Sequence, residues 1–183
     1  MTIHAMIDLE TLGTSQDTVV LSLGAVKFSP FNSEDPTDAL YIKPDVDEQT
    51  SVLNRTVDDD TLRWWNEQPS EISDEALSED DRISCVEFLA QLNRWCVGVD
   101  ILWCQGPLFD YAILEDFYRN MQQPCAWNYW QIRDSRTLFA LMPKDPRKAI
   151  QQQLHNALAD AYFQAQCVQS TYKHLNIERP EYD

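Results

Sequence analysis

A pair of carboxylates inside a predicted buried strand constrains this chain more than any other feature. Residues 3–11 are mostly apolar and predict a strand in which Asp8 and Glu10 are two positions apart. Residues two apart on a strand point to the same face, so both negative charges are directed at one spot. Close carboxylates repel one another, and their removal from water is unfavourable unless a cation is present. Because hard divalent cations take oxygen ligands, the pair favours a metal site, whereas the pair taken alone would more often be a solvated face.

Composition limits the kinds of protein this chain can be. The 183 residues, 44% of them hydrophobic, suit one globular domain over residues 1–183. The formal net charge of −16 argues against a surface that grips duplex nucleic acid along its length. An enzyme that acts on a chain end is still compatible with this charge, because metal ions can supply local positive charge.

The chain carries no pattern typical of a membrane or secreted protein. No window approaches the ~20 apolar residues that a membrane span needs, and the N-terminus lacks the charged and apolar regions of a secretory signal. The five cysteines are an odd number and contain no Cys-x-x-Cys pair, which argues against a disulfide framework and a zinc knuckle. We therefore expect a cytoplasmic protein with no membrane partner.

The order of predicted elements indicates the fold class. Short connections join the first three predicted strands, which favours an antiparallel meander, and helices then alternate with a further strand. Strands are expected over residues 3–11, 19–28, 39–42 and 100–104. Helices are expected over residues 58–66, 83–97, 108–121, 135–141 and 156–175, with residues 70–81 as a loop. The prediction is an α/β fold, a mixed sheet with antiparallel strands first, flanked by helices.

Two later segments supply further candidates. Asp110 lies just past the predicted strand 100–104, and sites in open α/β sheets collect at the carboxyl ends of strands. His155 and Asp160 are five positions apart, which on one helix would separate them by about 140°. They can share a site if His155 precedes the helix, and Asn156 is a suitable N-cap for a helix that starts after it.

Three motifs in this order resemble those of the DEDDh branch of 3'-5' exonucleases, a family with a ribonuclease H-like fold. They are Asp8-x-Glu10-Thr11, Phe109-Asp110 and His155-x-Ala157-x-x-Asp160. The likeness covers nearly the whole chain and is nearest to the phage exonuclease A type and the small bacterial exoribonucleases. The segments 62–65, 103–110 and 133–138 also look like theirs.

The resemblance implies an enzyme that removes nucleotides from the 3' end of single-stranded DNA or RNA. It further implies two Mg²⁺ or Mn²⁺ ions, which stabilise the attacking and leaving oxygens. Asp8, Glu10, Asp110 and Asp160 would hold the ions, and His155 would act as the general base.

The same resemblance suggests substrate contacts. Thr11 and Leu12 are expected to touch the 3'-terminal nucleotide, with Leu12 against the base. Trp64 and Trp65 are candidates for stacking on bases, which is a sequence-tolerant interaction. Because tryptophan mostly serves burial, we expect at least one of the two to pack inside the fold instead.

Two polar residues and the alternatives complete the prediction. Gln105 stands where the relatives often carry asparagine, and Arg136 is a candidate for binding phosphate or for an ion pair with a nearby aspartate. The alternative function is a catalytically inactive ribonuclease H-like module that binds nucleic acid or a protein partner such as a polymerase. The sequence does not choose between RNA and DNA, and it leaves a homodimer open.

Overall fold

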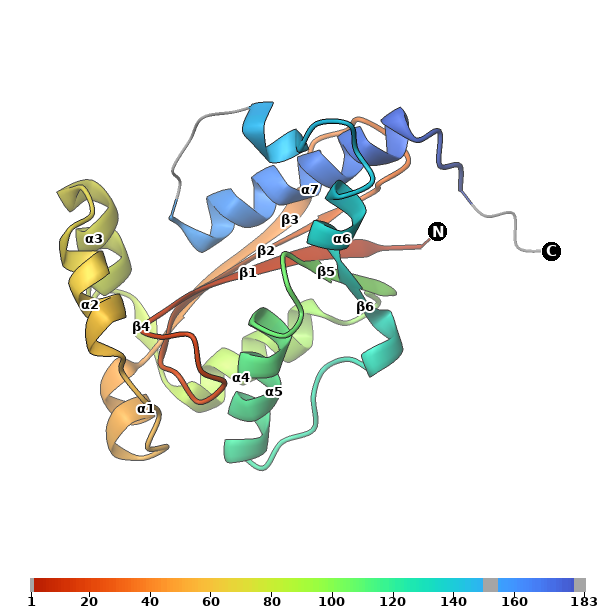
Figure 1. Cartoon of the computed structure of the whole chain (residues 1–183). Coiled ribbons are helices and arrows are strands. Elements are labelled where there is room, and N and C mark those ends of the chain that lie inside the picture. Colours follow the sequence, from red (N-terminus) through yellow and green to blue (C-terminus); the bar gives the residue numbers. More distant parts are fainter. Residues whose placement is uncertain (1, 150–154, 180–183) are drawn as a thin grey trace.

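Six strands form one mixed sheet in the computed structural model, which describes residues 2–149 and 155–179 (Figure 1). The strands lie in the order β4-β3-β2-β1-β5-β6. Their bounds are β1 His4–Thr11, β2 Val20–Phe28, β3 Thr37–Pro44, β4 Arg82–Ile83, β5 Ile101–Cys104 and β6 Ile132–Asp134. The three first strands pair antiparallel, whereas β5 runs parallel to β1 and β6 runs parallel to β5. This confirms the predicted α/β fold and the meander.

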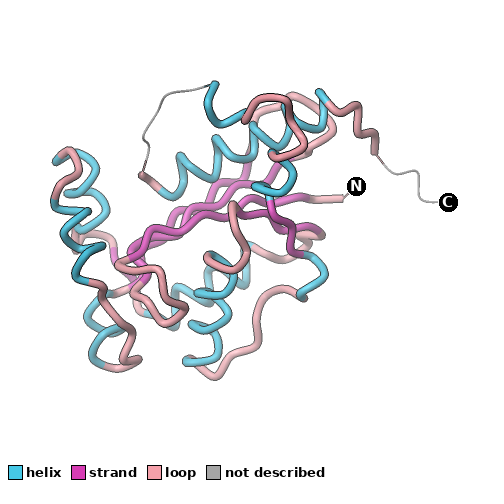
Figure 2. Tube along the Cα trace, in the orientation of Figure 1, coloured by secondary structure: helices cyan, strands magenta, loops and turns pink. Residues whose placement is uncertain are grey.

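Helices cover both faces of the sheet. The long helix α7 (Ala157–His174) lies along one face, and α4 (Cys85–Trp95) and α5 (Asp110–Asn120) cover the other (Figures 1 and 2). The alternation along β1 matches these layers: Ala5, Ile7 and Leu9 pack in the cluster that includes α4 and α5, whereas Met6 packs with apolar residues of α7. Even-numbered side chains of β1 therefore point toward α7.

The remaining helices gather at one end of the sheet and after β6. They are α1 (Val46–Ser51), α2 (Asp59–Asn66), α3 (Ser70–Leu77) and α6 (Ser135–Phe139), with short 3₁₀ turns at Tyr129–Gln131 and Pro146–Ala149. Asp58 caps α2, as its carboxylate accepts a hydrogen bond from the peptide N–H of Thr61. None of the helices in these two described ranges has the length and apolar character that a bilayer span needs.

The prediction of a loop over residues 70–81 is wrong for residues 70–77 and holds for residues 78–81. The helix α3 begins directly after Pro69, and Ala76 is fully buried beside a cluster that also contains Leu12 and Trp65. The acidic composition of the segment hides this apolar face, so tertiary packing overrides the local signal. The sequence also missed α1, β4 and β6, which are too short to show a period.

Candidate active site

Carboxylates from both ends of the chain meet where β1 approaches the start of α7. Oxygen atoms of Asp8, Glu10 and Asp160 lie within 4.8 Å of one another, and each of the three residues keeps some contact with solvent. Asp8 and Glu10 share the α7 side of β1 because they are two positions apart. Asp160 lies in the first turn of α7. Residues 150 or more positions apart in sequence are thus brought to one spot, which a cation can reach.

The grouping is electrostatically unfavourable without a cation. Burial, reinforced by repulsion from Asp110, Glu10 and Asp160, raises the pKa of Asp8 well above its usual value. Burial and the charges of Asp160 and Asp110 raise the pKa of Glu10 to about 8. Burial also raises the pKa of Asp160, although a hydrogen bond from the peptide N–H of Asn156 opposes this shift. A hard divalent cation, which takes oxygen ligands, would relieve the repulsion and favour the ionised carboxylates.

Asp110 is the fourth predicted carboxylate and is the first residue of α5, only 3% exposed. Asp110 lies outside the group of oxygens that are within 4.8 Å of one another, but its charge raises the pKa of both Asp8 and Glu10. Burial raises its pKa to about 7, and contacts with its own peptide group, the Cys104 thiol, the Leu9 backbone and a nearby cation, Arg136, oppose the shift. The parallel pairing of β5 with β1 explains its place, because β5 delivers the start of α5 to the carboxyl end of β1.

A glycine lets α7 approach the sheet closely enough to complete the cluster. Gly24 of β2 pairs with Asp8 of β1. A Cβ atom at Gly24 would lie 2.1 Å from the backbone of Ala157 and Leu158, far inside contact distance. Only a residue without a side chain fits between the sheet and the first turn of α7.

His155 lies just outside α7, directly before its N-cap Asn156, as predicted. Asn156 is the N-cap, and its side chain accepts a hydrogen bond from the peptide N–H of Ala159. His155 has a φ of +39°, in the left-handed region, which turns the chain just before the helix. The charge of His155 lowers the pKa of Asp160, against the effect of burial. The imidazole ring contacts the ring of Trp64 edge-on, with 5.0 Å between the centroids.

The two adjacent tryptophans of α2 have different surroundings. Trp65 is 1% exposed, and its indole N–H donates to the carbonyl of Thr11 at 2.9 Å, so it ties α2 to the end of β1. Trp64 is 39% exposed beside His155. The prediction that at least one of the pair packs inside the fold is therefore confirmed for Trp65, and stacking by Trp64 stays a prediction.

The structure gives the surroundings of the other predicted substrate residues, Thr11, Leu12, Gln105 and Arg136. Leu12 is 5% exposed in the cluster beneath α2 and α3, and the Thr11 hydroxyl donates to the carbonyl of Gly13. Arg136 is exposed on α6, next to Gly106, which follows Gln105. The assignments of these side chains to substrate binding stay predictions.

Two residues beside the cluster were missed from the sequence. Gln164 donates from Nε2 to Asp8 Oδ1 at 2.8 Å, and helical spacing could have placed it one turn beyond Asp160. Glu75 accepts hydrogen bonds from the Tyr41 hydroxyl and from Nδ2 of Asn156, and its charge acts on Glu10. Glu75 could not have been found, because its helix was predicted as a loop.

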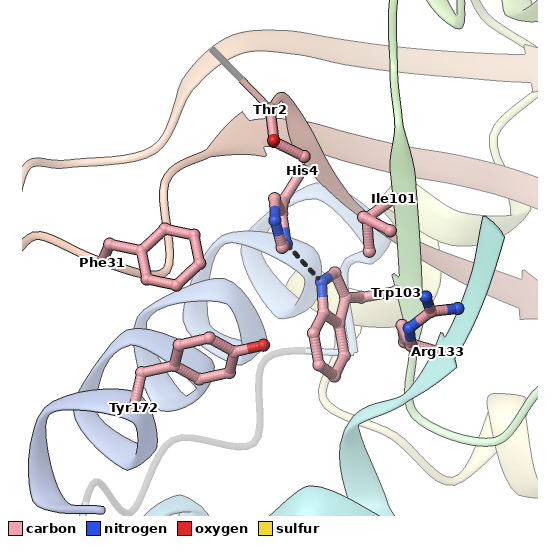
Figure 3. A pocket seen from close by; sticks show the side chains of 7 residues that line it. All are labelled: Thr2, His4, Phe31, Ile101, Trp103, Arg133 and Tyr172. Carbon is pink, nitrogen blue, oxygen red and sulfur yellow. Dashed lines mark hydrogen bonds between the residues drawn. The ribbon is translucent and has the colours of Figure 1, made fainter. Parts of the chain in front are cut away.

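An aromatic pocket of about 170 Å³ lies at the opposite end of β1 from the carboxylates. Figure 3 shows its wall, where the Trp103 indole N–H donates to Nδ1 of His4 at 3.0 Å and the Tyr172 hydroxyl points inward. Burial lowers the pKa of His4 to about 4, so its ring is neutral. The hydrogen bond from Trp103 and the ring contacts with Phe28 and Phe31 indicate a structural role for His4.

Solved structures share this fold across almost the whole chain. The zinc-bound complex of exonuclease I from E. coli with single-stranded DNA superposes with a TM-score of 0.67 at 18% identity, covering 97% of this chain and 42% of that one. The complex of the same enzyme with a dT13 oligonucleotide gives 0.64 at 19% identity, with 96% and 43% covered. The chain thus spans less than half the length of these exonucleases. The likeness confirms the predicted ribonuclease H-like exonuclease fold.

Sequence comparison adds a curated relative and a family. An exodeoxyribonuclease of Enterobacteria phage T4 is 27% identical over 158 residues, which cover 72% of this chain and 68% of the phage protein. The family described as the "3'-5' exoribonuclease Rv2179c-like domain" matches residues 3–172. The chain belongs to this 3'-5' exoribonuclease Rv2179c-like family.

Proposed function

We propose that the chain acts as a single-domain, metal-dependent 3'-5' exonuclease of the DEDDh type that hydrolyses single-stranded nucleic acid from its 3' end. The observation that carries this proposal is the meeting of Asp8, Glu10 and Asp160 at one end of the sheet, with Asp110 beside them, in a chain of this family. Four carboxylates from three distant segments form a donor set that suits catalysis better than stability, because their mutual repulsion opposes folding.

The side chains fit Mg²⁺ or Mn²⁺. The donors are carboxylate oxygens with no thiolate or imidazole among the three that lie within 4.8 Å of one another, which suits a hard cation. When bound, two such ions supply positive charge to the attacking and leaving oxygens of the phosphodiester. In our proposal Asp8, Glu10, Asp110 and Asp160 would hold the ions, and Asp8 is central because the charges of the other three all act on it.

His155 is the proposed general base. Its place just before α7 brings the imidazole beside Asp160 without using a position on the helix. A neutral imidazole there takes a proton from the attacking water, and the ionised Asp160 then stabilises the imidazolium. The edge contact with Trp64 limits how far the ring can turn away.

Substrate binding in this proposal uses the rim of the carboxylate cluster. Trp64 offers an exposed indole for base stacking, and Arg136 offers a cation to a backbone phosphate. In the same proposal Thr11 and Leu12 contact the 3'-terminal nucleotide, and Gln105 is a further candidate for substrate binding. The family description names an exoribonuclease, whereas the phage relative is an exodeoxyribonuclease. Both RNA and DNA therefore belong in the test. The five free cysteines favour a reducing compartment such as the cytoplasm.

The test is digestion of matched 5'-labelled DNA and RNA oligonucleotides, single- and double-stranded, with Mg²⁺ or Mn²⁺. We expect a ladder that shortens from the 3' end, disappears with EDTA and disappears in the D8A variant. The matched control is E87Q, which removes a carboxylate that pairs with Arg94 on α4, on the face of the sheet opposite α7. E87Q should digest like the wild type.

The opposite result favours the alternative. If the folded wild type binds the oligonucleotides but digests none of them with either metal, the chain is a binding module and the proposed activity is wrong. Digestion that persists in D8A would show that another site, or a contaminant, is responsible.

A further inference from the structure

Gln164 lies against the carboxylate cluster from the side of α7. It is one helical turn beyond Asp160 and is only 6% exposed. Its Nε2 donates to Asp8 Oδ1 at 2.8 Å. The opposite amide orientation would set two oxygens against each other, so only this orientation is compatible with an ionised Asp8.

The hydrogen bond acts on a carboxylate that three other carboxylates repel. Asp8 is opposed by Asp110, Glu10 and Asp160. A carboxylate in such a field would turn away from its neighbours unless one of its oxygens were held. An amide holds that oxygen without adding a charge, whereas a lysine at the same place would compete with a cation for the carboxylate.

The other end of the amide is also informative. The Oε1 atom of Gln164 is buried and has no hydrogen-bond partner among the described residues. Buried amide oxygens are normally paired, and an unpaired one is unfavourable. A water molecule or a hydrated ion beside Asp8 would supply the missing donor.

We propose that Gln164 is a positioning residue of the nuclease site: its amide fixes Asp8 in the orientation that holds the cations, and its Oε1 accepts a hydrogen bond from water bound there. This inference rests on the metal-dependent function proposed above. It predicts that removal of the amide weakens cation binding more than it weakens the fold, because ligand-orienting partners contribute about 10–100-fold to metal affinity.

The experiment compares Q164M with Q169M. Gln169 lies on the same helix, is 7% exposed, and donates from Nε2 to the carbonyls of Ser29 and Glu34, away from the carboxylates. Both variants exchange a buried amide for an apolar side chain of similar size. We measure Mn²⁺ affinity by calorimetry, melting temperature without metal, and kcat and KM for a single-stranded oligonucleotide.

For Q164M we expect Mn²⁺ affinity to fall about 10–100-fold and kcat to fall with little change in KM, while the metal-free melting temperature changes no more than in Q169M. Q169M should bind Mn²⁺ like the wild type. If Q164M does not fold, Q164N tests the same contact, because it keeps the amide but is one methylene too short to reach Asp8.

The inference is overturned if Q164M binds Mn²⁺ as tightly as the wild type, or if Q169M loses the same affinity. Failure of the wild type itself to bind Mn²⁺ would overturn the proposed function and this inference with it. Mn²⁺ binding that is unchanged by Q164M would overturn the inference alone.

Discussion

Replacement of Gly24 by alanine should move the start of α7 and disable the carboxylate cluster. The added Cβ would lie 2.1 Å from the backbone of Ala157 and Leu158, whereas ordinary contact begins at 3.4 Å, so the backbones must separate by about 1.3 Å. Asp160 lies in this first turn and His155 directly precedes it. A displacement of about 1 Å at a reacting group can lower the rate about 100-fold, and we expect a loss of this order in kcat/KM.

Stability should fall by a smaller and separable amount. Overpacking typically destabilises by about 1–3 kcal/mol, which for a chain of this size lowers the melting temperature by roughly 2–12 °C. Gly98 provides the matched control: it has a φ of +78° and nothing within 4 Å of an added Cβ. G98A should lose about 1 kcal/mol through backbone strain and keep its activity.

Thermal denaturation gives the melting temperature of each variant. Oligonucleotide digestion by both variants is then measured below these temperatures. Digestion by G24A at the wild-type rate would show that Gly24 does not set the position of α7, and so would an equal loss of activity in G98A at equal stability.

Three further predictions concern the cluster and the tryptophan pair. D8N should abolish digestion but raise the metal-free melting temperature near pH 8 by a few degrees. The reason is that D8N removes a carboxylate whose pKa is raised by burial and by repulsion from its neighbours. A lower melting temperature would contradict this prediction. The pKa values of Glu10, about 8, and Asp110, about 7, lie above their unfolded values, so their stabilising contribution is complete at low pH and is lost as the pH rises toward about 8. Scanning fluorimetry in EDTA should therefore show a melting temperature that falls between about pH 5 and pH 8, and Mg²⁺ should raise it more at pH 8; equal effects of Mg²⁺ at both values would exclude this linkage. W65F removes the indole hydrogen bond to Thr11, so its free energy of unfolding in urea should fall by roughly 1–3 kcal/mol. W64A should keep its stability and bind an oligonucleotide more weakly by about 1–3 kcal/mol. The reverse pattern would show that the two roles are exchanged.

The sequence predicted the parts of the site that follow from local geometry. The two-residue period of a strand places Asp8 and Glu10 on one face, and the capping preference of Asn156 separates His155 from the helix that carries Asp160. These rules involve only a few neighbouring residues. The strands of the meander and the long helices were predictable for the same reason, because each shows its period over many positions.

The missed features depend on contacts between distant segments. Gly24 lies in an ordinary apolar strand pattern, and only the closeness of α7 shows why a side chain is excluded there. Gln164 looks like any helical glutamine until Asp8 is placed beside it. Glu75 belongs to an acidic helix whose apolar face is small, with Ala76 as its buried residue, so its pattern resembles that of a loop.

The contrast between the neighbouring indoles of α2 provides an optical probe of the protein. Trp65 is sealed from solvent, so its emission should be insensitive to added solutes, whereas Trp64 is open at the mouth of the site. Acrylamide quenching of Trp64 should therefore decrease when an oligonucleotide arrives, and the difference in quenching between the wild type and W64F would follow occupancy without any label.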